Sequence, residues 1–340
     1  MTKIALIGYG TVGQSFVQLI LDKREDLATL YGVDAEIVAI SGRSKGSIYD
    51  PDGLDLEQIT ENFKQTGSLE TYPKDTKGLS SLETITNTNA DTIIEATTTN
   101  IETGEPSLSF VRAALSHGKN VITSNKGPAA LAYRELKELA EKNNVQYRIE
   151  STVISGTPAI NFTTETLAGH EITRVMGIIN GTTNYILTKM EKGASYDDVL
   201  KEAQKLGYAE ADPTADVEGW DAVAKIMILG NAVLGGSLKT MDVERVGIIG
   251  ITPEEIKQAQ SNGERIKLIA EAYKEKGKVK ARVAPMRLKL SHPLAHVNDA
   301  MNALTVSTDG LGDVTVIGGG AGGLGTAHGL LSDLISIHRR

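Results

Sequence analysis

One lysine in the sequence has the setting of a proton-transfer group. Lys225 lies in an apolar run and is the only cation of a helix that we expect over Trp220–Leu234. Asp221 precedes it by one helical turn on the same face, and a buried ammonium group needs such a partner. If burial outweighs the attraction of the acid, a lysine of this kind exchanges protons near neutrality. The residues alone leave a structural ion pair and a catalytic group equally open.

Acidic residues gather immediately before this helix. The stretch from Glu210 to Asp221 holds five carboxylates within twelve residues, among them Asp216. Acids at a helix N-terminus offset the helix dipole, which explains some of them. That explanation does not extend to the lysine.

A second candidate lysine follows an expected strand. Lys126 comes just after Val121–Thr123, and Thr97 and Thr98 follow the strand Thr92–Glu95 in the same way. Carboxyl ends of parallel strands face the ligand crevice of an open sheet, so these residues are expected beside a ligand. An exposed loop lysine and a simple turn are the alternatives.

A glycine pattern near the N-terminus predicts a dinucleotide site. The expected strand Ile4–Ile7 runs directly into Gly8-Tyr-Gly-Thr-Val-Gly13, which opens an expected helix over Thr11–Leu30. The first glycine permits the tight turn, the second admits the pyrophosphate, and the third lets the helix pack on the strand. The candidate cofactor-binding residues are therefore Gly8, Gly10, Thr11, Val12 and Gly13.

The residues after the second expected strand, Glu36–Ile40, bear on the choice of cofactor. A carboxylate there would accept hydrogen bonds from a free ribose 2′-hydroxyl, but the segment reads Ser41-Gly-Arg43-Ser-Lys45. Two cations and two hydroxyls suit a 2′-phosphate, so NADP is favoured over NAD. Solvated loop charges are the alternative for Arg43 and Lys45.

The order of expected elements indicates an α/β protein of two domains. Residues 1–150 alternate short apolar strands with amphipathic helices, which predicts a doubly wound, Rossmann-type parallel sheet. Within them, residues 44–81 look like an irregular insertion with one helix at Leu54–Phe63. A second, α+β domain is expected over 151–319, with helix starts at Ser195 and Thr252.

The end of the chain carries another glycine-rich turn, Gly318 to Gly323, before a last helix. No strand follows to complete a further βαβ unit, so we expect residues 320–340 to return to the first domain. A second nucleotide site and a purely structural turn are the alternatives. Antiparallel strands expected at Lys267–Tyr273 and Val279–Leu290 would suit a subunit interface.

Composition excludes several classes of protein. A net charge of −8 argues against nucleic-acid binding, which needs concentrated basic surface. The absence of cysteine excludes disulfides, thiolate metal sites and thiol-dependent semialdehyde dehydrogenases. No run approaches the ~18 apolar residues of a spanning helix, so a cytoplasmic protein without a membrane partner is expected.

Two segments of the second domain, together with the terminal segment, closely resemble the homoserine dehydrogenase family. They are Gly177-Ile-Ile-Asn-Gly-Thr-Thr-Asn-Tyr-Ile186 and Gly207-Tyr-Ala-Glu-Ala-Asp-Pro-Thr-Ala-Asp-Val-Glu-Gly-Trp-Asp-Ala-Val-Ala-Lys225. The terminal Gly320-Ala-Gly-Gly-Leu-Gly-Thr326 is similar to the family's cofactor-closing loop. The resemblance runs over nearly the whole chain.

The resemblance implies reversible hydride transfer between L-homoserine and L-aspartate 4-semialdehyde, in threonine and methionine biosynthesis. It implies that Lys225 exchanges a proton with the substrate oxygen, that Glu210 holds the substrate's ammonium group, and that Asp216 and Asp221 support them. Gly181 and Thr182 would line the substrate pocket, and Lys126 would lie near the reacting oxygen and the nicotinamide. The cofactor would also contact Thr97, Thr98, Ser124 and Gly322.

Further properties follow from the resemblance. Glu150-Ser-Thr-Val153 is similar to a segment that holds a structural sodium ion through one carboxylate and backbone carbonyls. The family suggests a homodimer, and the resemblance is to the short form of the family, for which no C-terminal regulatory domain is expected. A dehydrogenase for another small amino or keto acid and a non-catalytic NADP-binding sensor are the alternatives.

Overall fold

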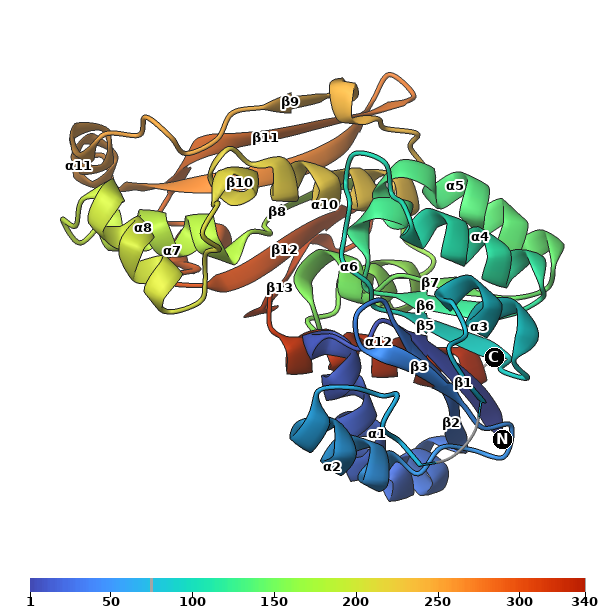
Figure 1. Cartoon of the computed structure of the whole chain (residues 1–340). Helices are drawn as coiled ribbons and strands as arrows, with labels where there is room; N and C mark the ends of the chain where they lie inside the picture. The colour runs from blue at the N-terminus through green and yellow to red at the C-terminus, as the bar shows by residue number, and fades with distance from the viewer. Residues whose placement is uncertain (74–75, 340) are drawn as a thin grey trace. The chain divides into compact units, whose positions relative to one another are not determined.

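The computed structural model describes residues 1–73 and 76–339. The chain divides into two compact units, each described here by itself (Figure 1). Unit 1 combines Met1–Gly156 with Gly322–Arg340, and unit 2 is Thr157–Ala321. The terminal helix thus belongs to the same unit as the first strand.

Unit 1 is built on a seven-stranded sheet in the order β4-β3-β2-β1-β5-β6-β7. Its strands are β1 (Thr2–Ile7), β2 (Ala35–Gly42), β3 (Gly46–Tyr49), β4 (Thr76–Lys77), β5 (Thr92–Glu95), β6 (Asn120–Thr123) and β7 (Tyr147–Arg148). Its helices are α1 (Thr11–Tyr31), α2 (Leu56–Thr66), α3 (Ser81–Asn87), α4 (Ser107–Ser116), α5 (Lys126–Lys142), α6 (Ser151–Ile154) and α12 (Gly323–His338).

Five neighbouring strands, β2, β1, β5, β6 and β7, are parallel, as predicted for a doubly wound fold. The expectation of an irregular insertion over residues 44–81 is wrong in part. β3 pairs antiparallel with β2, and β4 with β3, so this stretch extends the sheet before and after α2. The short turn at Arg43–Lys45 makes a hairpin, which the sequence alone did not distinguish from a loop.

Apolar strands form the core of unit 1. Ile4 to Ile7 are fully buried, as strands covered on both faces of a parallel sheet must be. α1 packs against α12 and α4 against α5, and the two pairs cover opposite faces of the sheet (Figure 1). Leu330 and Leu334 of α12 are also fully buried in this core.

Unit 2 has a six-stranded sheet in the order β13-β12-β8-β10-β11-β9. Its strands are β8 (Ile172–Ile178), β9 (Val243–Arg245), β10 (Glu264–Glu275), β11 (Lys278–Lys289), β12 (Met301–Thr308) and β13 (Gly312–Gly319). Its helices are α7 (Gly181–Met190), α8 (Tyr196–Lys205), α9 (Thr214–Val217), α10 (Trp220–Ala232) and α11 (Pro253–Ser261), with shorter turns η1 (Phe162–Thr166), η2 (Thr240–Asp242) and η3 (Pro293–His296).

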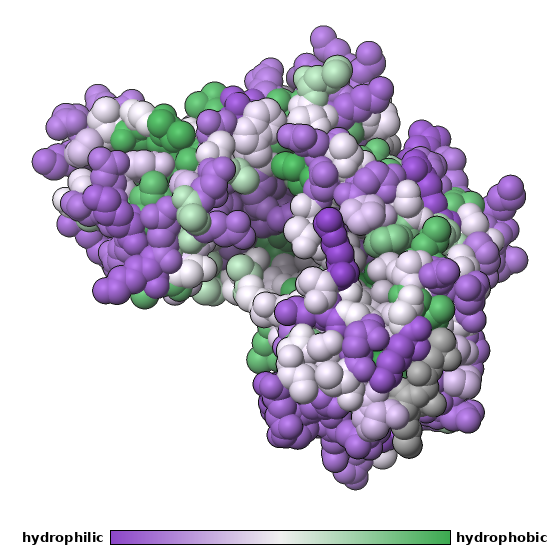
Figure 2. Space-filling view, viewed as in Figure 1, coloured by the Kyte–Doolittle hydropathy of each residue, from purple (hydrophilic) through white to green (hydrophobic). Residues whose placement is uncertain are grey.

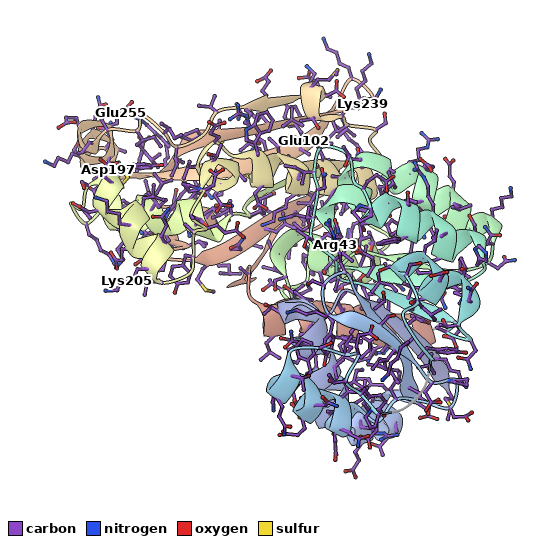
Figure 3. All side chains as sticks on the ribbon, in the orientation of Figure 1. Arg43, Glu102, Asp197, Lys205, Lys239 and Glu255 are labelled. Carbon is purple, nitrogen blue, oxygen red and sulfur yellow. The ribbon has the colours of Figure 1, made fainter. Side chains whose placement is uncertain are left out.

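The antiparallel pairing of β10 with β11 and the buried α10 are confirmed. Ser195 caps α8, and Thr252 caps α11 in a capping box, as the sequence predicts. Asp197 and Glu255 lie in the first turns of these helices, where carboxylates offset the helix dipole (Figure 3).

The surface is mainly hydrophilic in the view of Figure 2. Within residues 1–73 and 76–339, no helix combines the length and apolarity needed to cross a membrane.

Candidate active site

Lys225 is buried in unit 2, as its apolar neighbours in the sequence predict. Its residue is 8% exposed, and its Nζ lies 2.8 Å from the Asp221 carboxylate, one helical turn earlier on α10. The Lys225 ammonium also donates to the Ile179 carbonyl at 2.8 Å. The charge is therefore paired and fixed at the start of an apolar helix, which satisfies the requirement for burying an ammonium group.

Asn180 connects this ion pair to a second acid, Asp216. The sequence did not reveal this bridging role of Asn180. Its Nδ2 donates to Asp216 at 2.7 Å and to Asp221 at 3.0 Å. Its Oδ1 accepts from the Thr183 N–H, so Asn180 is also the N-cap of α7. One amide therefore fixes two carboxylates and a helix terminus together.

The environment of Asp216 makes its carboxyl harder to ionise than one in water. Burial raises the pKa of Asp216, and the negative charge of Asp221 raises it further, although the hydrogen bond from Asn180 opposes both. A carboxyl of this kind holds a proton more readily than one in water.

The first turn of α7 carries the two residues expected to line a substrate pocket. Helix geometry leaves the N–H groups of Gly181 and Thr182 without intrahelical acceptors, and the dipole makes this end positive. The Thr182 hydroxyl donates to the Tyr208 carbonyl at 2.6 Å. That bond holds the segment leading to Glu210 beside α7, and Glu210 itself is exposed.

In unit 1, the three glycines of the first turn differ in their surroundings. Gly8 has a φ of +105°, and a Cβ there would lie 2.5 Å from the Ala96 oxygen. A Cβ on Gly13 would lie 2.1 Å from the Gly8 oxygen, whereas one on Gly10 would meet nothing within 4 Å. The first and third positions therefore need glycine for the turn and for packing, and the second leaves open space in front of α1.

The terminal glycine turn lies beside the first one. Gly322 is the N-cap of α12 with a φ of +107°, and a Cβ on the next residue, Gly323, would lie 2.7 Å from Thr11 Cγ2. The N-termini of α1 and α12 are thus neighbours, and their dipoles add at one place on unit 1. Val12 is half-buried in the first turn of α1.

Arg43 lies at the tip of the β2–β3 hairpin and is exposed. It is labelled in Figure 3. Lys45 is half-buried, with its Nζ 5.6 Å from the centroid of the Phe63 ring. The Lys45 side chain is therefore held by a cation–π contact inside unit 1, whereas the Arg43 side chain extends into solvent.

The candidate residues after β5 and β6 gather at one sheet edge. Asn125 donates through Nδ2 to the carbonyls of Thr97, at 3.2 Å, and Thr98, at 3.3 Å. Asn125 also caps α5, whose first residue is Lys126. Lys126 therefore belongs to the first helical turn and not to a loop.

The neighbouring residue Ser124 donates its N–H to the Glu95 carbonyl at 3.2 Å. Glu95 was not predicted as a site residue, although it is a carboxylate at the end of a fully buried strand.

The segment resembling a cation site forms the short helix α6. Glu150 is its N-cap and is 2% exposed, and its N–H donates to Asp333 of α12 at 2.9 Å. Val153 is also buried, and Ser155 has a φ of +58°. In the described part of the chain, no three His, Cys, Asp or Glu side chains gather so as to hold a metal ion.

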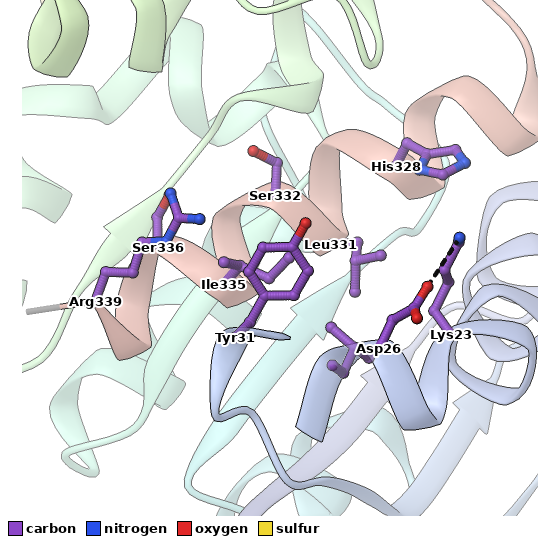
Figure 4. A pocket seen from close by; sticks show the side chains of 10 residues that line it. Lys23, Asp26, Tyr31, His328, Leu331, Ser332, Ile335, Ser336 and Arg339 are labelled. Carbon is purple, nitrogen blue, oxygen red and sulfur yellow. Dashed lines mark hydrogen bonds and ion pairs between the residues drawn. The ribbon is translucent and has the colours of Figure 1, made fainter. Parts of the chain in front are cut away.

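A cavity of about 350 Å³ lies elsewhere on unit 1, between α1 and α12 (Figure 4). Its lining comes from the C-terminal half of α1, including Lys23, Asp26 and Tyr31, and from α12, including His328 and Ser332. The glycine turns lie at the opposite end of α1, so this cavity is separate from them.

Comparison with known proteins agrees with this geometry. The family model described as homoserine dehydrogenase matches residues 158–335, and the model of its NAD-binding domain matches residues 8–150. An NAD(+)-dependent homoserine dehydrogenase of Pseudomonas canavaninivorans is 42% identical over 99% of this chain and 96% of its own length. A homoserine dehydrogenase of Methanocaldococcus jannaschii is 42% identical over 98% of each chain.

Solved structures give the same result. A mutant of a hyperthermophilic archaeal homoserine dehydrogenase, in complex with NADPH, superposes with a TM-score of 0.85 at 32% identity, over 98% of this chain and 97% of that one. Two family models together span most of the chain, and full-length relatives share its sequence and fold. The chain belongs to the homoserine dehydrogenase family.

Proposed function

We propose that the protein is an NADP-preferring homoserine dehydrogenase that interconverts L-homoserine and L-aspartate 4-semialdehyde. The observation that carries the proposal is the buried Lys225–Asp221 ion pair, joined through Asn180 to Asp216 at the N-terminus of α7. A lysine fixed by an acid and a carbonyl can deliver a proton to one defined position.

The side chains of unit 2 would divide the work on the substrate. Lys225 takes the hydroxyl proton of homoserine during oxidation and returns it to the aldehyde oxygen during reduction. Asp221 holds the lysine in place and stabilises its charged form. The first turn of α7, at Gly181 and Thr182, suits the substrate carboxylate, and Glu210 suits its ammonium group.

Unit 1 would bind the dinucleotide at the paired N-termini of α1 and α12. The open space at Gly10 admits a pyrophosphate, and the exposed amides and both dipoles favour its charge. A bound nicotinamide supplies or accepts the hydride. Thr97, Thr98, Ser124 and Lys126 would orient the ring, since they follow the carboxyl ends of neighbouring parallel strands.

The test of the catalytic role is steady-state oxidation of L-homoserine with NADP at alkaline pH. Lys225→Ala is expected to lower kcat by roughly a hundredfold or more, because general acid–base groups contribute that much. Lys205→Ala removes an exposed lysine of α8 and should leave kcat unchanged (Figure 3).

Normal turnover by Lys225→Ala would refute the proton-transfer role. Nucleotide binding by the wild type without any homoserine-dependent change in nicotinamide absorbance would indicate a sensor instead.

The preference for NADP rests on Arg43 at the hairpin tip, where it is free to reach a 2′-phosphate. Arg43→Ala should lower kcat/KM for NADP about tenfold, since a charge-assisted hydrogen bond is lost. The value for NAD, which has no such phosphate, should stay the same. Equal losses of kcat/KM with both cofactors would contradict this preference. A wild-type protein that favours NAD, as the name of the Pseudomonas relative states for that enzyme, would contradict it as well.

We also propose a homodimer through the sheet of unit 2. One face of this sheet packs on α10, where a Cβ on Gly230 would lie 3.5 Å from the Ala272 Cβ. Ile269 lies on the other face with Ala303, and Ile317 pairs with Ala303 across β12 and β13. Ile317 is 55% exposed there, and an exposed apolar side chain on an open sheet face suits a two-fold contact.

A structural sodium ion at α6 completes the proposal. The Glu150 carboxylate and backbone carbonyls such as that of Val153 are the hard oxygen donors that such an ion prefers. Sodium should raise the melting temperature above that in choline at equal ionic strength. Identical melting curves in the two salts would argue against the site.

A further inference from the structure

Glu95 is a fully buried carboxylate at the carboxyl end of β5. It pairs in register with Ile7 of β1 on one side and with Thr123 of β6 on the other. Ile7 directly precedes the Gly8 turn, so Glu95 lies beside the proposed dinucleotide site while remaining inaccessible to solvent.

Four donors converge on this carboxylate from three segments. The Thr97 N–H donates at 2.9 Å, and the Thr97 hydroxyl also donates to the same oxygen. The other oxygen accepts from the hydroxyl of Ser107, the first residue of α4, at 2.6 Å and from that of Thr123 at 2.7 Å. All four donors are neutral groups.

The network continues from Glu95 to the helix that carries Lys126. The Thr123 hydroxyl accepts from the Asn125 N–H at 2.9 Å, and the Thr97 carbonyl and hydroxyl accept from Asn125 Nδ2. Asn125 Oδ1 accepts from the Gly127 N–H at 3.0 Å and caps α5. The orientation of the first turn of α5 therefore depends on the carboxylate through two hydroxyls and one amide.

Stability alone does not account for a charge at this position. A buried ion loses its hydration, and well-packed apolar side chains are often as stable or more stable in its place. A carboxylate offers acceptor sites in several directions at once, which an apolar or singly accepting side chain does not. It can therefore fix three separate segments relative to one another.

We propose that Glu95 is a positioning residue for hydride transfer, which sets the 97–98 loop and the first turn of α5, with Lys126, relative to the Gly8 turn. The proposal rests on the function proposed above. Glu95 reaches no solvent and acts only through Thr97, Thr123 and Asn125.

The test is Glu95→Gln in steady-state oxidation of L-homoserine with NADP. Glutamine keeps the shape, and the hydroxyls of Ser107 and Thr123 can turn to accept from its N–H₂ group, so the variant should fold. The Thr123 hydroxyl proton then lacks its acceptor and the loops lose their fixed geometry. We expect kcat to fall at least about tenfold, because small displacements of reacting groups have large effects. The KM for homoserine, which is bound by unit 2, should stay within about twofold of the wild-type value.

Lys119→Met is the matched control at the other end of the sheet. Lys119 is also buried, precedes β6, and donates to the Thr88 carbonyl at 2.8 Å. This variant should melt at a lower temperature with kcat within about twofold of wild type. A general loss of stability would lower kcat in both variants alike.

A double-mutant cycle separates positioning from mere structural damage. If Glu95 acts through the helix start at Lys126, the double variant should have a kcat no more than about twofold below that of Lys126→Ala alone. Should Glu95→Gln fail to fold, Thr123→Ser and Thr123→Val provide the comparison. Serine keeps the hydroxyl and should retain kcat, whereas valine should lose it as Glu95→Gln does.

A wild-type kcat in Glu95→Gln would overturn this inference and leave the proposed function standing. So would a double variant whose loss of kcat equals the product of the losses in Glu95→Gln and Lys126→Ala. A wild-type protein that does not oxidise homoserine would overturn the proposed function and this inference with it.

Discussion

Asp216 belongs to the proposed substrate site, and its charge lowers the stability of the folded protein. Its pKa lies above the ordinary aspartate value, mainly because it is buried and also because Asp221 is near. In the pH range just above the ordinary value, the folded state therefore binds more protons than the unfolded state. The free energy of unfolding then falls as the pH rises through this range.

Asp216→Asn should remove that penalty. The neutral amide can still accept from Asn180, so we expect a higher melting temperature at pH 7 and a difference from wild type that vanishes in acid. Activity should fall, because the substrate site loses a charge. Asp212→Asn is the control, since hydrogen bonds donated by Thr214 lower the pKa of this exposed acid and their loss should not stabilise the protein. Thermal melts between pH 3 and pH 8 provide the measurement, and a destabilised Asp216→Asn at pH 7 would contradict the argument.

The sequence revealed some site residues and not others, for a physical reason. Lys225 and Asp221 were predictable as a pair because helix periodicity places residues four apart on one face. Asn180 was not, because its bond to Asp221 joins residues 41 apart in sequence. The same holds for Glu95 and Thr123, 28 residues apart. Local periodicity carries no information about such contacts.

The N-cap of α7, Asn180, has both a structural role in the helix and a chemical role at the site. Asn180→Ala should lower the free energy of unfolding by about 1 kcal/mol, as loss of an N-cap does, and should also lower kcat by releasing Asp216 and Asp221. Ser195→Ala removes the cap of α8 and should lower stability similarly with kcat unchanged. Denaturant melts and steady-state rates of both variants test this. Equal kinetics in the two variants would show that Asn180 is only a cap.

Most elements of unit 1 were predictable from apolar runs and glycine turns, but their boundaries were less so. The start of α5 at Lys126 was not predicted, because Asn125 caps it with a side-chain bond that could equally have formed a turn. β3 was missed because Gly46-Ser-Ile-Tyr49 contains no apolar run of the kind that revealed β5.

The resemblance to homoserine dehydrogenases is confirmed by relatives that match nearly the full length of the chain. The homodimer and the cytoplasmic location stay predictions, because neither follows from the fold of one chain. The dimer is open to a direct test.

Ile317→Asp should convert a dimer to a monomer, since it places a charge in the apolar contact proposed for the sheet face of unit 2. Leu311→Asp is the control, because Leu311 is 61% exposed but lies in the turn between β12 and β13. Light scattering during gel filtration gives the mass of each variant. A monomeric wild type, or a dimeric Ile317→Asp, would exclude this interface.

The return of α12 to unit 1 has a consequence for biosynthesis. Unit 2 is one continuous segment, whereas the core of unit 1 needs Leu330 and Leu334 from the last helix to be made. A chain emerging from the ribosome can thus complete its inserted half first, while the nucleotide-binding half waits with an uncovered apolar face. Chaperones that shield such faces should therefore associate with nascent chains until α12 has emerged.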